Sequence, residues 1–110
     1  MPSSPIYSAR LATEVLAASG FVTEPNVPAG HTYVIRDVET RQEPGANNEV
    51  IIRDLSRGNA IILSVEAAAG HGRSWTGHIV LPEGTSWQVQ ALGVSAHVTV
   101  SGYDLLAAPT

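Results

Sequence analysis

The chain has 110 residues, enough for one domain around a single hydrophobic core. Its formal charge of −4 argues against a dedicated nucleic-acid-binding protein, and the absence of cysteine excludes disulfides, thiolate catalysis and cysteine-ligated zinc. There is no apolar run of about 18 residues and no signal-peptide pattern at the N-terminus, so we expect synthesis in the cytoplasm without export. All six basic residues are arginine, so no lysine guards the sheet edges, and we expect assembly to protect them.

The N-terminal part of the chain gives the weakest structural signal. Residues 1–5, with two Pro and two Ser, predict an extended arm without a core of its own. Ile6–Ala18 fits a helix through the spacing of its apolar residues, and it also fits a strand through its alternation. We favour the strand, because β-structure is indicated everywhere after it, and we allow at most one short helix in Arg10–Ala18.

The middle of the chain predicts four strands separated by turn residues. The predicted strands are Phe21–Val27, Thr32–Thr40, Glu49–Leu55 and Ala60–Ala67. Residues 56–59 are a short turn, so the last two of these strands should form a hairpin. Residues 41–48 carry the Pro, Gly and Asn of an exposed loop, and residues 68–72 predict a flexible connection.

Strict alternation is clearest in the last third of the chain. The predicted strands there are Arg73–Leu81, Thr85–Leu92 and Val94–Ser101. Trp87 shares one face with Val89 and Ala91, and Trp75 shares one with Ile79, so period-two geometry favours the core for both tryptophans. His97 alternates to the polar face of the last strand. Residues 105–110 are expected to form a C-terminal tail.

Together these segments predict an all-β protein. We expect a single jelly-roll-like β-sandwich of seven to eight short antiparallel strands over residues 6–104. Two turns, Val27–Gly30 and Leu81–Gly84, share the pattern apolar-Pro-x-Gly, and an aromatic residue follows three positions after each glycine. The repeat predicts two hairpins or corners in similar places in the fold.

The candidates for chemistry are weak. The Pro-x-Gly turns resemble those of cupins, metal-binding jelly rolls in which a histidine ligand stands at the positions held here by Tyr33 and Trp87. No ligand spacing links the four histidines, His31, His71, His78 and His97. The sequence contains no nucleophile elbow and no phosphate loop. We therefore predict no catalytic, cofactor-binding or metal-binding residues, no cofactor and no enzymatic activity.

Four short segments carry a resemblance to a known class of proteins. They are Tyr7–Thr13, Val27–Gly30, Val34–Val38 and Val100–Leu105. In this pattern the chain resembles small structural proteins of tailed bacteriophages of actinobacteria, of the minor tail or decoration type. The resemblance implies a β-sandwich building block, present in many copies per particle and without catalysis.

The expected function is therefore that of a virion structural protein, made in the host cytoplasm. Our first interpretation is a minor tail or tail-tip component that contacts other virion proteins and forms a homo-oligomer, a trimer first and a six-fold ring second. Contact with nucleic acid or membrane is not expected. Residues 1–5 would clasp a neighbouring subunit. Two alternatives stay open: a capsid decoration (cement) protein at three-fold positions, or a carbohydrate- or host-receptor-binding module that uses Trp75 or Trp87.

Overall fold

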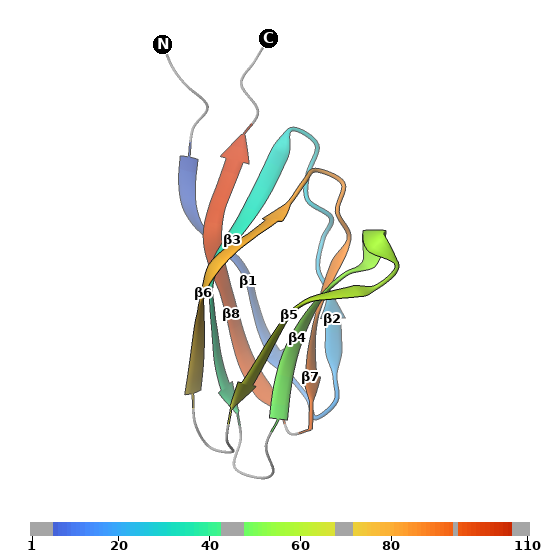
Figure 1. Cartoon of the computed structure of the whole chain (residues 1–110), viewed down its shortest axis with the longest axis vertical. Helices are drawn as coiled ribbons and strands as arrows, with labels where there is room; N and C mark the ends of the chain where they lie inside the picture. The colour runs from blue at the N-terminus through green and yellow to red at the C-terminus, as the bar shows by residue number, and fades with distance from the viewer. Residues whose placement is uncertain (1–5, 43–47, 68–71, 94, 107–110) are drawn as a thin grey trace.

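The computed structural model describes residues 6–42, 48–67, 72–93 and 95–106. These residues form two four-stranded antiparallel sheets that pack face to face (Figure 1). The strands are β1 (Ile6–Leu16), β2 (Phe21–Thr23), β3 (His31–Gln42), β4 (Asn48–Asp54), β5 (Ala60–Ala67), β6 (Gly72–Leu81), β7 (Trp87–Leu92) and β8 (Ala96–Leu106), with one 3₁₀ turn, η1 (Leu55–Arg57). In this part of the chain no helix is long and apolar enough to cross a membrane.

The strand order is that of a jelly roll. One sheet runs β1-β8-β3-β6 and the other β2-β7-β4-β5, so the chain crosses repeatedly between the two layers. The all-β sandwich that the sequence predicts is confirmed. The ambiguous N-terminal segment is a strand, because β1 pairs along its whole length with β8.

The core lies between the sheets and is built by the predicted alternation. Trp87, Val89 and Ala91 of β7 are buried, as are Ala96, Val98 and Val100 of β8. Trp75 and Ile79 of β6 are partly buried and pack against this core. The inner faces of both sheets are therefore the ones that the period-two pattern selects.

The two Pro-x-Gly turns are corners between the sheets, and the alternative of two hairpins is wrong. One turn leads from β2 to β3 and the other from β6 to β7, and the two lie against each other. The Gly84 N–H donates to the Val27 carbonyl (2.8 Å), and the Val27 N–H donates to the Thr85 carbonyl (3.0 Å). Gly30 and Gly84 have φ angles of 80° and 79°, in the left-handed region that glycine adopts without a steric penalty.

Several predicted boundaries shift. The predicted hairpin of β4 and β5 is confirmed. The segment that connects the two strands begins with the 3₁₀ turn η1, which is capped by a hydrogen bond from the Ser56 N–H to the Asp54 carboxylate (2.9 Å). β2 is shorter than predicted, because the chain leaves the sheet after Thr23 toward the corner. Leu105 and Leu106, expected in the tail, belong to β8, since they continue its pairing with β3. The predicted arm of residues 1–5 lies outside the described residues, so the domain assignment stays a prediction.

Candidate functional site

Both tryptophans belong to the packed interior. Trp87 is 1% exposed, and Trp75 is partly buried with its indole ring lying over Gly77. The sugar-binding alternative needs an exposed aromatic face on which a sugar ring can stack. Trp87 offers none, and Trp75 packs against the core with only part of its surface exposed, so the observation counts against that alternative.

The histidines do not converge. His78 and His97 are exposed, and His71 lies outside the described residues. His31 instead makes a hydrogen bond with Asp104, with 2.6 Å between Nδ1 and Oδ1. No group of three His, Cys, Asp or Glu side chains in the described ranges has the geometry for a metal ion. The absence of a metal stays a prediction.

The His31–Asp104 pair joins residues far apart in the sequence. The pairing of β3 with β8 sets Tyr33 opposite Asp104, and His31 stands two positions before Tyr33 on the same face. Burial, and then the Asp104 charge, raise the pKa of Tyr33 above its usual 10.0. No motif in the sequence marks this cluster. It fixes the start of β3 to the end of β8, close to the two corners.

A second titratable pair links the two sheets at their β1/β2 edge. Glu24 is 6% exposed, its N–H donates to the Trp87 carbonyl (2.9 Å), and its Oε2 has no hydrogen-bond partner. Its carboxyl group is hydrogen-bonded to that of Glu14 on β1. Burial, followed by this hydrogen bond and the Glu14 charge, raises the pKa of Glu24 from 4.5 to about 8. At neutral pH Glu24 is therefore protonated and donates to Glu14.

The Glu14–Glu24 pair predicts a pH-dependent stability. Between pH 4.5 and about 8 the unfolded chain loses the Glu24 proton while the folded chain keeps it. The free energy of unfolding should therefore fall as pH rises, by at most about 1.4 kcal/mol per pH unit from this group. Denaturant unfolding across this pH range measures the slope. Glu24→Gln should flatten it, whereas the exposed Glu39→Gln should leave it unchanged; equal slopes for wild type and Glu24→Gln would contradict the assignment.

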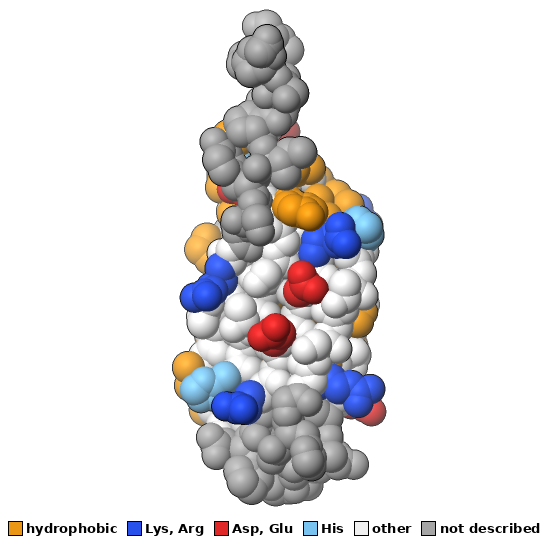
Figure 2. Space-filling view, turned by 90° about the vertical axis from the view of Figure 1, so that its left-hand side faces the viewer, with side chains coloured by type: hydrophobic (Ala, Val, Ile, Leu, Met, Phe, Trp, Pro, Cys, Tyr) orange, Lys and Arg blue, Asp and Glu red, His pale blue; other side chains and the backbone are white. Residues whose placement is uncertain are grey.

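The outer face of the β1-β8-β3-β6 sheet is polar and charged. Asp37 and Glu39 project from the middle of β3, and both are exposed. Figure 2 faces this sheet and shows acidic side chains near its middle, with arginine and histidine side chains around them. A face with this composition is suited to contact with solvent or with a charged partner.

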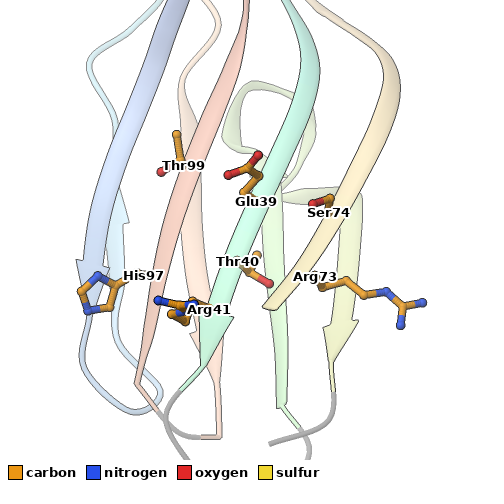
Figure 3. A pocket seen from close by; sticks show the side chains of 7 residues that line it. All are labelled: Glu39, Thr40, Arg41, Arg73, Ser74, His97 and Thr99. Carbon is orange, nitrogen blue, oxygen red and sulfur yellow. The ribbon is translucent and has the colours of Figure 1, made fainter. Parts of the chain in front are cut away.

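One end of this face is hollowed. A depression of about 400 Å³ is lined by Glu39, Thr40, Arg41, Arg73, Ser74, His97 and Thr99. Figure 3 shows Arg41 and His97, register partners on β3 and β8, at one margin, Arg73 at the other, and Glu39 above them. Neither Arg41 nor Arg73 forms an ion pair with a described residue. Only Arg41 lies on the outer face with the hydroxyls of Ser74 and Thr99 and the carboxylate of Glu39. Arg73 pairs with the buried Thr40, and its side chain points away from the others in Figure 3.

Comparison with known proteins shows a fold and no family. No protein-family model matches the sequence, and no curated protein matches it. A protein from the Bacillus endospore appendages, a family of disulfide-linked pili, has a TM-score of 0.58 at 7% identity, covering 97% of this chain and 93% of that one. A chain of infectious bursal disease virus, Gx strain, has a TM-score of 0.54 at 10% identity, covering 99% of this chain.

The match to the viral protein covers 33% of that chain, so this chain spans about a third of its length. At such identities the likeness establishes the jelly-roll sandwich and leaves function to be argued separately.

Proposed function

We propose that the chain is a non-enzymatic structural subunit of a tailed-bacteriophage virion. The observation that carries the proposal is the sandwich itself: an eight-strand jelly roll of the kind found in a virus particle and in a pilus protein. The resemblance of four sequence segments to phage structural proteins supports the choice of a phage. The pili whose protein has a similar fold are disulfide-linked, and this chain has no cysteine, so its copies would assemble without disulfide bonds.

Within the virion, a minor tail or tail-tip position is our first choice, and capsid decoration at three-fold positions is the second. Closed symmetry buries an exposed apolar surface on every copy without growth into fibres. We therefore propose a trimer as the first choice of oligomer and a six-fold ring as the second. Among the residues that the structure describes, four large apolar side chains are strongly exposed, and they provide surface that contacts would cover. They are Val15, Phe21, Ile61 and Val80. The arm of residues 1–5 is proposed to clasp a neighbouring subunit.

The carbohydrate- or receptor-binding alternative is weaker. It requires Trp75 or Trp87 at the surface, whereas Trp87 is buried inside the sandwich and Trp75, partly buried, packs against the core. The residues lining the hollow include no aromatic side chain that could replace them.

The proposal predicts that the protein is a stoichiometric component of purified particles. Quantitative mass spectrometry should find a copy number that is a multiple of three or six. An epitope inserted into the predicted loop of residues 41–48, labelled with gold and viewed by electron microscopy, should mark the tail. Labelling over the capsid would select the decoration alternative. Absence of the intact, untagged protein from purified particles would refute the virion role altogether.

A further inference from the structure

The strongly exposed large apolar side chains lie on the edge strands of the two sheets. Among the described residues each of the four edge strands carries one and the inner strands carry none: Val15 on β1, Val80 on β6, Phe21 on β2 and Ile61 on β5. In the described part of the chain each edge strand pairs with a single neighbour, so the other side of its backbone is free to pair. Both lateral edges of the sandwich therefore suit a contact with another β-sheet.

The β1/β2 edge holds a buried carboxyl pair that is incomplete in a single copy. Glu14 and Glu24 are hydrogen-bonded to each other, and neither forms an ion pair with a described residue. Glu24 is 6% exposed, and its buried Oε2 atom has no hydrogen-bond partner in the described ranges. A buried oxygen without a partner is costly, so this site would gain from a donor that an isolated copy does not supply.

An arginine without an ion-pair partner lies at the opposite edge of the β1-β8-β3-β6 sheet. Arg73 of the edge strand β6 is exposed and forms no ion pair with any residue that the structure describes. In Figure 3 its side chain points away from β3, beyond the free edge of β6. The guanidinium group is therefore available to a neighbouring molecule.

Arg73 and Glu14 stand at the two ends of one row of residues that crosses the sheet. Arg73 is opposite Thr40, and Thr40 is opposite Val98. Val98 in turn is opposite Glu14. Thr40 and Val98 are buried, so the whole row belongs to the inner face of the sheet. A second copy placed beside the first at the same level would thus bring its Glu14 next to Arg73.

The directions of the strands fit this placement. Each neighbouring pair in the order β1-β8-β3-β6 is antiparallel, so β1 runs antiparallel to β6. Two copies side by side in the same orientation would therefore join β6 of one to β1 of the other as an antiparallel pair. In the adjacent rows Ser74 would face Thr13, so that two hydroxyl groups meet. Trp75 would face Ala12, so that a large ring meets a small side chain.

We propose that β6 of one copy pairs with β1 of a second copy of this chain, so that Arg73 of the first donates to the Glu14–Glu24 pair of the second. The guanidinium group supplies the cation and the hydrogen-bond donor that the buried carboxyl groups lack. Because two different edges meet, the contact is heterologous and closes into a ring when the rotation between copies allows it. The inference rests on the proposed structural role and deepens it by naming the edges through which copies join.

The test is a charge exchange in the full chain. Arg73→Glu and Glu14→Arg should each weaken self-association, measured by analytical ultracentrifugation, by at least about tenfold. The double variant should associate again, because opposite charges then face each other with their positions exchanged. Arg41→Glu is the matched control: it makes the same change of charge at an exposed arginine of the inner strand β3 and should associate like wild type. Amide hydrogen exchange in β1 and β6 should slow on association.

Other results would overturn the contact. Wild-type protein that stays monomeric at every concentration, or an Arg73→Glu variant that associates like wild type, would remove it. Weakening by both single variants without recovery in the double variant would show that Arg73 and Glu14 do not meet.

Melting curves check that each variant folds. Arg73→Gln and Glu14→Gln replace a pair of variants of which one does not fold, and the double glutamine variant should then associate no more weakly than either single one. Additive weakening would count against the contact in the same way. A successful exchange together with absence from purified particles would refute the virion role and leave the contact between copies intact.

Discussion

Replacing Gly102 with alanine is expected to destabilise the fold by roughly 3 kcal/mol or more, the upper end of what overpacking costs. Gly102 lies buried in β8, opposite Ile35 of β3 and next to the register shift that spans Arg36. A Cβ atom there would stand 1.9 Å from the Val34 carbonyl oxygen and 2.9 Å from the Arg36 nitrogen. Both atoms belong to the backbone of the central strand pair, so relief would require β3 and β8 to separate. Denaturant or thermal unfolding of the variant measures the loss.

Gly77→Ala is the matched control for Gly102→Ala. Gly77 lies in β6 of the same sheet, and its added Cβ would meet the Trp75 ring, with the nearest atom at 2.6 Å. A side chain moves more easily than paired backbone, so this variant should lose much less stability. A Gly102→Ala protein as stable as wild type, or no less stable than Gly77→Ala, would show that β3 and β8 are not packed this closely.

Trp87→Ala is expected to cost roughly 3–5 kcal/mol, as for other large-to-small changes in cores. Trp87 is the largest fully buried side chain, 1% exposed, and it packs in the core beside the corner of residues 81–84. Truncation removes its buried apolar area and leaves a cavity between the sheets. Equilibrium unfolding in denaturant gives the change in the free energy of unfolding.

The variant Trp87→Phe separates the effect of the volume of this side chain from the effect of its buried N–H group. The indole Nε1 is buried without a hydrogen-bond partner, so phenylalanine keeps most of the volume and removes an unsatisfied donor. It should therefore lose much less stability than alanine does. A loss below about 1 kcal/mol for Trp87→Ala would mean that the side chain is exposed in solution, and it would revive the sugar-binding alternative.

The alternation of apolar and polar residues was sufficient to predict the strands whose two faces differ sharply in polarity. β7 alternates buried and partly exposed residues throughout, and β8 follows with Ala96, Val98 and Val100 inside, as the sequence predicts. β1 was ambiguous because a register shift between Arg10 and Ala12 breaks its alternation. An interrupted period of two is hard to distinguish from a helical period, and the pairing with β8 resolves the question.

The contacts between residues far apart in the chain could not be predicted from the sequence, and the reason is physical. His31 and Asp104 meet because β3 and β8 pair in one particular register, and Glu14 meets Glu24 because two sheets pack at one edge. Neither arrangement leaves a local spacing to detect. The repeated Pro-x-Gly turns did predict two similar turns in the fold. Whether these turns are hairpins or corners could be decided only from the order of the strands in the sheets.

The pairing of β1 with β8 has a consequence for synthesis on the ribosome. Of the described strands β1 emerges first, and its one hydrogen-bonded neighbour among them, β8, emerges last. At the usual rate of about 5–20 residues per second, β1 waits on the order of ten seconds for that neighbour. Throughout this interval the apolar residues of β1, Leu16 among them, lack the β8 side chains beside them, so the nascent chain is most prone to aggregation before β8 is translated.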